Sequence, residues 1–409
     1  MSPLNTLYNA CRDGIAPEVL RLVKKEKKKG RLASFINEKA DGVASPLEIA
    51  LKNEHQDVAE ILVEKGGAAV NLFLSAEQGD TPLIIAATHN WLPLARCLVE
   101  KGGADVNMCT VAYKFTALQV ACENNSFEVA KYVIEKGAAL EQTNSSGDTA
   151  LLFCCEHGNR EIAALLLANG AGVNLARSGG GDTPLIACSQ EGHLEVVRLL
   201  LDEGAEIDKA NNNGNTPLFQ SSGNGYQEVA KLLLASGANV AQANTVGASP
   251  LFISCQQGHV EVVKLLMANG ADVNQASKDG STPLYLSSRL GHCEVVRLLL
   301  AGGARAGRAR IDGDTPLSAS GRNGHHAVVK LLLAEDAKAG GTGKKAGSAE
   351  GGGKPTKKAA RVCGKCGKEA EKMKKCSVCK SVRYCSKECQ LKDWKEHKKS
   401  CEKKEARKK

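Results

Sequence analysis

Residues 183–205 read TPLIACSQEGHLEVVRLLLDEGA, and this stretch sets the pattern for most of the chain. Thr183 is a favourable N-cap, because its hydroxyl can accept from the free backbone amides of a first helical turn. Pro184 fits the first helical position, where the amide hydrogen that it lacks would have no partner within the helix. Gly192 is suited to end that helix. The stretch therefore predicts two short helices, the second from about Leu194 to Glu203.

The second predicted helix is apolar on both flanks. A helix of this kind must be sandwiched between neighbours to bury both sides. Gly204 follows as a left-handed C-cap, and the polar residues 208–215 form a turn that leads onward. The apolar positions are Leu194, Val197, Leu200 and Leu201 on one flank, and Val196 and Leu199 on the other.

The same pattern returns along the chain at intervals of 33 to 36 residues. Internal repetition at this period indicates copies that stack on one another and share a continuous core. Residues 4–29 form a degenerate first copy with one apolar and one lysine-rich side, as a terminal cap requires, which gives ten copies. The signature Thr/Ser-(Pro/Ala)-Leu begins at Ser45, Thr81, Thr116, Thr149, Thr183, Thr216, Ser249, Thr282 and Thr315.

The motifs T-P-L, G-H, V-V-x-L-L-L and G-A-x-V-N at this period resemble the ankyrin repeat family over residues 1–335. The resemblance implies a mainly α ankyrin-repeat solenoid of about ten helix-turn-helix copies, with a concave face that binds a protein partner. The family usually places histidine after T-P-L, so we expect the hydrogen bonds of that histidine to be absent or replaced by packing. The residues at this position are Glu48, Ile84, Gln119, Leu152, Ile186, Phe219, Phe252, Tyr285 and Ser318.

The family's geometry also implies which side chains lie on the binding face, with an ordinary solvated face as the alternative at each position. They are Arg289, Leu290, Arg322, Asn323, Gln256, Gln257, Tyr226 and Trp91, together with a basic loop formed by Arg305, Arg308 and Arg310.

Cysteines and histidines recur within the repeats. The cysteines could form a redox or metal site, but we interpret them as small buried apolar side chains. The histidines could form a ladder of metal ligands, but we interpret them as structural side chains between helices. The cysteines are Cys122, Cys154, Cys155, Cys188 and Cys255, and the histidines are His193, His259, His292 and His325.

Composition restricts the class of protein further. Aromatic residues make up 4% and glycines number 42, which suits short helices separated by glycine turns. No stretch approaches the roughly 18 apolar residues of a membrane span, and Met1 to Ala10 has no basic start or apolar run. We therefore expect an intracellular protein, cytoplasmic, nuclear or both, in which clustered cysteines bind metal rather than form disulfides.

Residues 336–361 read DAKAGGTGKKAGSAEGGGKPTKKAAR, and no apolar period survives in them. This composition predicts a flexible tether. Seven cysteines and one histidine follow, and eight soft ligands fill two tetrahedral shells, so we predict two structural Zn²⁺ ions with no open position for catalysis. The ligands fall in the pairs Cys363/Cys366, Cys376/Cys379, Cys385/Cys389 and His397/Cys401.

This spacing, with the string YCSKECQLKDWKEH at 384–397, resembles the MYND-type zinc finger; the Cys-x-His and closing CxxC of the competing RING domain are missing. The resemblance places the finger at 362–402, before a basic tail at 403–409. It implies a cross-braced arrangement, with Cys363, Cys366, Cys385 and Cys389 on one ion and Cys376, Cys379, His397 and Cys401 on the other. It also implies capture of proline-containing peptides by Ser377, Gln390 and Trp394.

The tryptophan has a physical case of its own. An indole in a domain with little interior can stay partly exposed and stack on proline rings. The alternative role of Trp394 is packing over the second metal site.

Two functions remain in view. The first is a monomeric adaptor or scaffold, in which the repeats bind one protein and the finger captures a peptide from another. The alternative is a nucleic-acid or chromatin-associated transcriptional regulator acting through residues 336–409. These hold 24 basic and 9 acidic residues, a net charge of +15, against 30 and 36 in the rest. The basic residues lack the interleaved aromatics that stack on bases. No nucleophile–base pair or phosphate loop is visible, so we expect no enzyme.

Overall fold

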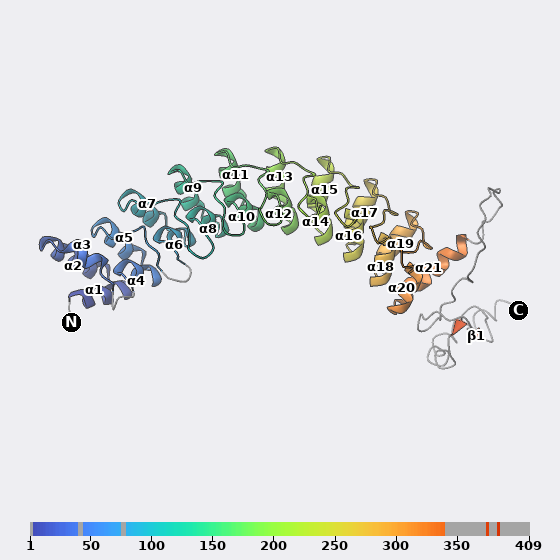
Figure 1. Ribbon diagram of the computed structural model, residues 1–409, viewed down its shortest axis with the longest axis horizontal. Helices are drawn as coiled ribbons and strands as arrows, with labels where there is room; N and C mark the ends of the chain where they lie inside the picture. The colour runs from blue at the N-terminus through green and yellow to red at the C-terminus, as the bar shows by residue number, and fades with distance from the viewer. Residues whose placement is uncertain (1–2, 40–43, 75–78, 340–373, 376–382, 385–409) are drawn as a thin grey trace. The chain divides into compact units, whose positions relative to one another are not determined.

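The computed structural model describes residues 3–39, 44–74, 79–339, 374–375 and 383–384. The chain divides into two compact units, the N-terminal unit 1–212 and the C-terminal unit 213–409. Figure 1 labels the helices of each unit in chain order. Helices dominate the described part of both units, as the sequence predicts. Apart from α3, the helices in these residues form ten consecutive pairs, which confirms the expected number of copies.

In the N-terminal unit, the first helices of successive pairs contact one another, and so do the second helices, so that the pairs stack as two layers. The helix α3 (Leu32–Asn37) belongs to no pair and buries Phe35 and Ile36. The paired helices are α1 Pro3–Arg12, α2 Ala16–Lys28, α4 Pro46–Lys52, α5 Gln56–Glu64, α6 Pro82–Thr88, α7 Leu92–Glu100, α8 Ala117–Glu123, α9 Phe127–Glu135, α10 Ala150–His157, α11 Arg160–Ala168, α12 Pro184–Glu191 and α13 Leu194–Asp202.

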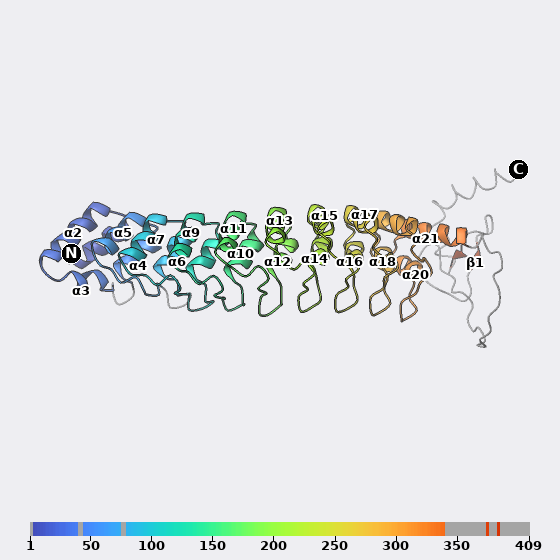
Figure 2. The same ribbon diagram turned by 90° about the horizontal axis from the view of Figure 1, so that it is seen from above.

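The C-terminal unit repeats the arrangement: α14, α16, α18 and α20 form one layer, and α15, α17, α19 and α21 the other. Figure 2 shows the second helices of each unit along one side and the connecting loops along the other. The elements are α14 Pro217–Asn224, α15 Gln227–Ala235, α16 Pro250–Gln257, α17 Val260–Ala268, α18 Pro283–Leu290, α19 Cys293–Ala301, α20 Pro316–Arg322, α21 His326–Ala339, β1 Lys374–Lys375 and β2 Arg383–Tyr384.

The last helix, α21, is longer than the sequence pattern indicates. It continues to Ala339, past residue 336, where the sequence pattern predicts the start of the tether. Residues 335–339 read EDAKA, which contains no helix breaker, and the first glycine follows at position 340. The remainder of the predicted tether lies outside the described residues.

The repeat signature works as predicted at the start of the first helix in the nine copies that carry it. Thr183 accepts a hydrogen bond from the backbone N–H of Ile186 at 3.2 Å, and the other eight signature residues cap their helices in the same way. Each such cap contributes about 1 kcal/mol. Gly192 ends α12 with φ of 83°. Val196, Val197 and Leu200 of α13 are buried between neighbours.

The position after T-P-L follows the expectation only in part. Apolar side chains such as Ile186 and Phe252 replace hydrogen bonds by packing. Gln119 instead forms new hydrogen bonds: its amide donates to the carbonyl oxygens of Gln142 at 2.8 Å and Asp148 at 2.9 Å. A single amide therefore ties its own helix to the loop of the next copy.

The five repeat cysteines are buried. Burial raises the pKa of the Cys154, Cys155 and Cys255 thiols, so these side chains stay neutral and pack as small apolar groups. Within the described residues, no three His, Cys, Asp or Glu side chains lie close enough to hold a metal ion. Among the helices in the same ranges, none combines the length and apolar character needed to cross a membrane.

Candidate functional site

Two adjacent hollows open between α16 and α18 of the C-terminal unit. They have volumes of about 450 Å³ and 420 Å³ and share Gln256 and Arg289. We call the pair the α16–α18 groove. Its first hollow is lined by Val246, Phe252, Gln256, Ser277, Lys278, Asp279, Ser281, Leu286, Arg289 and Arg310. Its second is lined by Gln256, Gln257, Arg289, Leu290 and His292.

The floor of the groove is apolar. Phe252 of α16 and Leu286 of α18 are 8% and 5% exposed, and they belong to one buried cluster with Phe219 and Tyr285. At the rim, Val246 is 58% exposed and Leu290 is 40% exposed. Ligand sites commonly combine such apolar walls with a few polar groups.

The polar groups that face the groove include several without partners. Arg289 and Lys278 are exposed, and neither side chain forms an ion pair within the described part of the chain. The side-chain amides of Gln256 and Gln257 also form no hydrogen bond with the described residues. These four side chains remain available to a ligand.

Arg310, in contrast, is held in a network. Its guanidinium donates to Asp279 at 2.6 Å and pairs with Asp312 at 3.2 Å. It also lies over the ring of Tyr285, 5.2 Å from the ring centroid. The charge of Arg310 is therefore largely satisfied inside the protein.

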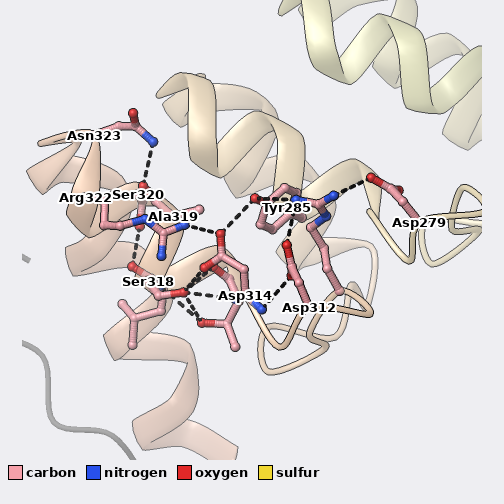
Figure 3. Close-up of polar contacts among 12 residues, drawn as sticks. Asp279, Tyr285, Asp312, Asp314, Ser318, Ala319, Ser320, Arg322 and Asn323 are labelled. Atoms are coloured by element: carbon pink, nitrogen blue, oxygen red, sulfur yellow. Dashed lines mark hydrogen bonds and ion pairs between the residues drawn. The ribbon is translucent and has the colours of Figure 1, made fainter. Parts of the chain in front are cut away.

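Figure 3 shows the second half of this network around Asp314. The carboxylate accepts hydrogen bonds from Tyr285 at 2.9 Å, from Ser318 and from Arg322. Burial alone would raise the pKa of Asp314, but these three donors outweigh it and lower the pKa. Hydrogen bonds from Ser277, Ser281 and Arg310 likewise hold the pKa of Asp279 well below its usual range.

Histidines of the following copies fix the backbone of the groove. The Nε2 atom of His292 donates to the carbonyl oxygen of Gln256 at 3.0 Å, and that of His325 donates to the carbonyl oxygen of Arg289 at 2.9 Å. The two residues shared by both hollows are thus held by equivalent contacts. This geometry confirms the structural interpretation of the histidines.

The structure brings only some of the predicted surface residues together. Gln256, Gln257, Arg289, Leu290 and Arg310 line the groove. The others lie elsewhere. Arg322 is paired with Asp314, and Asn323 caps α20. Arg308 donates to the carbonyl oxygen of Asn274, and the backbone of Arg305 is bound to the Asn274 side chain. Tyr226 occupies the N-cap position of α15 without a side-chain capping hydrogen bond, and Trp91 in the N-terminal unit stacks on His89.

Sequence reasoning did not place Val246, Lys278, Phe252 or Leu286 at the site. Val246 and Asp279 each directly precede a glycine of positive φ, Gly247 and Gly280, in equivalent loops. A residue that varies between copies and is followed by a glycine thus marks the tip of the loop in each copy. This pattern is visible in the sequence and could have indicated these positions. The partial exposure of Phe252 depends on neighbouring copies and has no local signal.

The eight predicted zinc ligands and the peptide-binding residues Ser377, Gln390 and Trp394 lie outside the described residues. The structure describes two short paired strands in this region. Lys374 pairs with Tyr384 and Lys375 with Arg383, antiparallel. The residues directly before Cys376 and Cys385 are therefore on neighbouring strands.

Models of known protein families match the sequence of this chain. The profile for ankyrin repeats (3 copies) matches residues 67–144, 103–177, 151–244 and 240–310, and a single ankyrin repeat matches 312–339. The matched residues make up more than half of the chain. Stacked repeats with an open groove define a protein-interaction module. The chain belongs to the ankyrin repeat family.

A second match, to the MYND finger, covers residues 363–401. Zinc finger MYND domain-containing protein 10 homolog of Drosophila melanogaster is 52% identical over 40 residues, which are 10% of this chain and 8% of that protein. The likeness is thus confined to a short segment. Ankyrin repeats and MYND fingers are non-catalytic modules that typically bind proteins, and a MYND finger implies zinc binding.

Proposed function

We propose that this protein is a non-enzymatic adaptor with two separate binding sites. The ankyrin array binds one protein partner, and the MYND finger captures a proline-containing peptide of another. The observation that supports this most is the α16–α18 groove, where unpaired Arg289 and Gln256 lie above the apolar Phe252 and Leu286. Tethering both sites on one chain raises the effective concentration of one partner near the other.

In this proposal the finger is held by two structural Zn²⁺ ions. Seven thiolates and one imidazole supply eight donors, which is the number that two closed tetrahedral shells require. Cys363, Cys366, Cys385 and Cys389 would hold one ion, and Cys376, Cys379, His397 and Cys401 the other. The ions would supply folding energy rather than chemistry, because no coordination position stays open.

The proposed peptide site of the finger consists of Ser377, Gln390 and Trp394. Trp394→Ala should abolish binding of a proline-containing peptide while both metals remain bound, as elemental analysis would verify. Unchanged recovery of peptide-bearing partners by this variant would rule out the tryptophan as the peptide contact.

Affinity purification with mass spectrometry tests the division of labour. The full chain is compared with a shortened chain ending at Ala360, which keeps the array and lacks the finger. We expect the shortened chain to retain one set of partners and to lose another. Recovery of the same set by both chains would contradict a binding role for the finger, and no recovered partner would contradict the adaptor itself.

The proposal places the adaptor inside the cell as a monomer. It rests on reading the clustered cysteines as zinc ligands, which a reducing compartment favours. Size-exclusion chromatography with light scattering measures the oligomeric state, and imaging of the tagged chain shows whether it resides in the cytoplasm, the nucleus or both.

A further inference from the structure

We propose that the α16–α18 groove is a receptor for a short extended peptide that carries an acidic side chain next to an aliphatic one. This inference rests on the proposed adaptor function and names the chemistry of the partner that the array selects.

The charge of the groove is the first observation. Its first hollow is lined by three cations, Lys278, Arg289 and Arg310, and one carboxylate, Asp279, which leaves a net charge of +2. Asp279 is bound to Arg310, so these two charges compensate each other. Arg289 and Lys278 remain, and an arginine fork recognises a carboxylate through two parallel hydrogen bonds.

The apolar floor is the second observation. Phe252 and Leu286 present the small exposed parts of their side chains to the hollow, and Val246 extends the apolar surface at the rim. An aliphatic side chain placed here would leave water for an apolar environment. Because Arg289 lines the same hollow, the ligand's acidic and aliphatic groups must be close together.

The two glutamines provide the third observation. Each side-chain amide carries both donors and an acceptor, and a peptide backbone offers the complementary pair at every residue. Gln256 and Gln257 lie next to each other at the end of α16 and both line the second hollow. They suit the main chain of an extended ligand, whatever its side chains.

Other occupants fit the groove less well. The chain's own residues 336–409 carry 24 basic and 9 acidic residues, and Arg289 and Lys278 would repel them. A single-stranded nucleic acid is bound by stacking its bases on exposed aromatic faces. The aromatic side chains here, Phe252 and Tyr285, are only 8% and 3% exposed.

Selection from a display library of short random peptides on the full zinc-loaded chain tests the inference. We expect the recovered peptides that the Trp394→Ala variant still binds to be enriched in Asp or Glu beside Leu, Ile or Val. Arg289→Glu should weaken their binding about tenfold or more. The matched control is Arg297→Glu on the exposed face of α19, which makes the same charge change outside the groove and should leave binding unchanged.

A second matched pair tests the apolar half. Val246→Ser lies in the lining of the groove, whereas Ile311→Ser alters a loop-tip residue that is 80% exposed and does not line it. Only Val246→Ser should weaken peptide binding. Both substitutions are at exposed positions, and circular dichroism verifies that each variant keeps the helicity of the parent chain.

Each contrary result has a distinct meaning. Among the recovered peptides that Trp394→Ala still binds, a lack of acidic residues, or equal binding of acidic peptides by Arg289→Glu, would overturn the inference. Displacement of the selected peptides by a DNA or RNA oligonucleotide would overturn it in favour of a phosphate ligand. If Arg289→Glu does not change the recovery of the partners that the array binds, the adaptor function is supported. The inference that the groove binds these partners is then wrong.

Discussion

At the scale of single residues, one histidine hydrogen bond recurs and fixes the backbone of the residues whose side chains face the groove. His259, His292 and His325 each donate to the residue two places before a helix-ending glycine of the preceding copy. The residues that accept, Gly223, Gln256 and Arg289, have unrelated side chains. A backbone held constant with a side chain free to vary is what a recognition surface needs.

Two adjacent histidines allow a direct check of this contact. His325→Ala should lower the free energy of unfolding of the C-terminal copies by about 1 kcal/mol, because the Arg289 carbonyl loses its donor. His326→Ala should have little effect, since His326 is exposed and no hydrogen bond of its side chain is seen among the described residues. Urea titrations of the two variants measure the difference, and equal midpoints would contradict the structural role.

The Asp314 carboxylate predicts a pH dependence. Its pKa is lowered in the folded protein, so its contribution is fully present above the unfolded value of about 4 and is lost as the pH falls through the folded pKa. Asp314→Asn should therefore cost about 1–3 kcal/mol at neutral pH, and the gap should narrow on acidification. The largely exposed Asp312 supplies the control Asp312→Asn. If the parent and Asp314→Asn still differ equally in free energy of unfolding at acidic pH, a property of the side chain other than its charge causes the difference.

At the scale of elements, two glycines of one copy separate two physical effects. Gly258 and Gly270 have φ of 82° and 85°. A Cβ at Gly258 would lie 2.7 Å from Nδ1 of His292, whereas a Cβ at Gly270 would meet nothing within 4 Å. Backbone strain is thus common to both positions, and steric conflict belongs to one.

We expect Gly270→Ala to cost about 1 kcal/mol through strain and Gly258→Ala about 1–3 kcal/mol more through overpacking. His292→Ala removes the ring that a Cβ at Gly258 would meet. In that background, Gly258→Ala should lower the free energy of unfolding no more than Gly270→Ala does. Denaturation of the single and double variants forms a double-mutant cycle. Additive costs of Gly258→Ala and His292→Ala would contradict the close packing.

The elements were also the part that the sequence predicted best. Local signals define α12 and α13, because Thr183, Pro184 and Gly192 act within a few residues of one another. The helix α3 was missed, since Leu32–Asn37 has no counterpart in the other copies. At the site, Gln256 and Arg289 were predicted from repeat position. The floor residues depend on how neighbouring copies pack, which no local pattern contains.

At the scale of the whole molecule, charge separates the two ends of the chain. Residues before 336 carry 30 basic and 36 acidic residues, whereas the remainder carries 24 and 9. Opposite net charges favour different partners for the two regions. This asymmetry agrees with an adaptor whose two sites select different proteins.

Zinc removal should affect one region only. A chelator should unfold the finger, because its metal ions supply its folding energy, while the helices of residues 3–339 keep their ellipticity, since the described part of the array holds no metal site. Elemental analysis before chelation should give two zinc ions per chain. Loss of most of the helical signal on chelation would show that metal also supports the array.

The adaptor claim is tested most directly by asking whether one chain holds both partners at once. A partner that requires Arg289 is used as bait, and the retained complexes are probed for a partner that requires Trp394. We predict that the intact chain bridges the two and that Arg289→Glu or Trp394→Ala each breaks the bridge, with Arg297→Glu as the silent control. The account would be contradicted if binding of one partner excluded the other. It would also be contradicted if the three-protein complex still formed with Arg289→Glu and with Trp394→Ala.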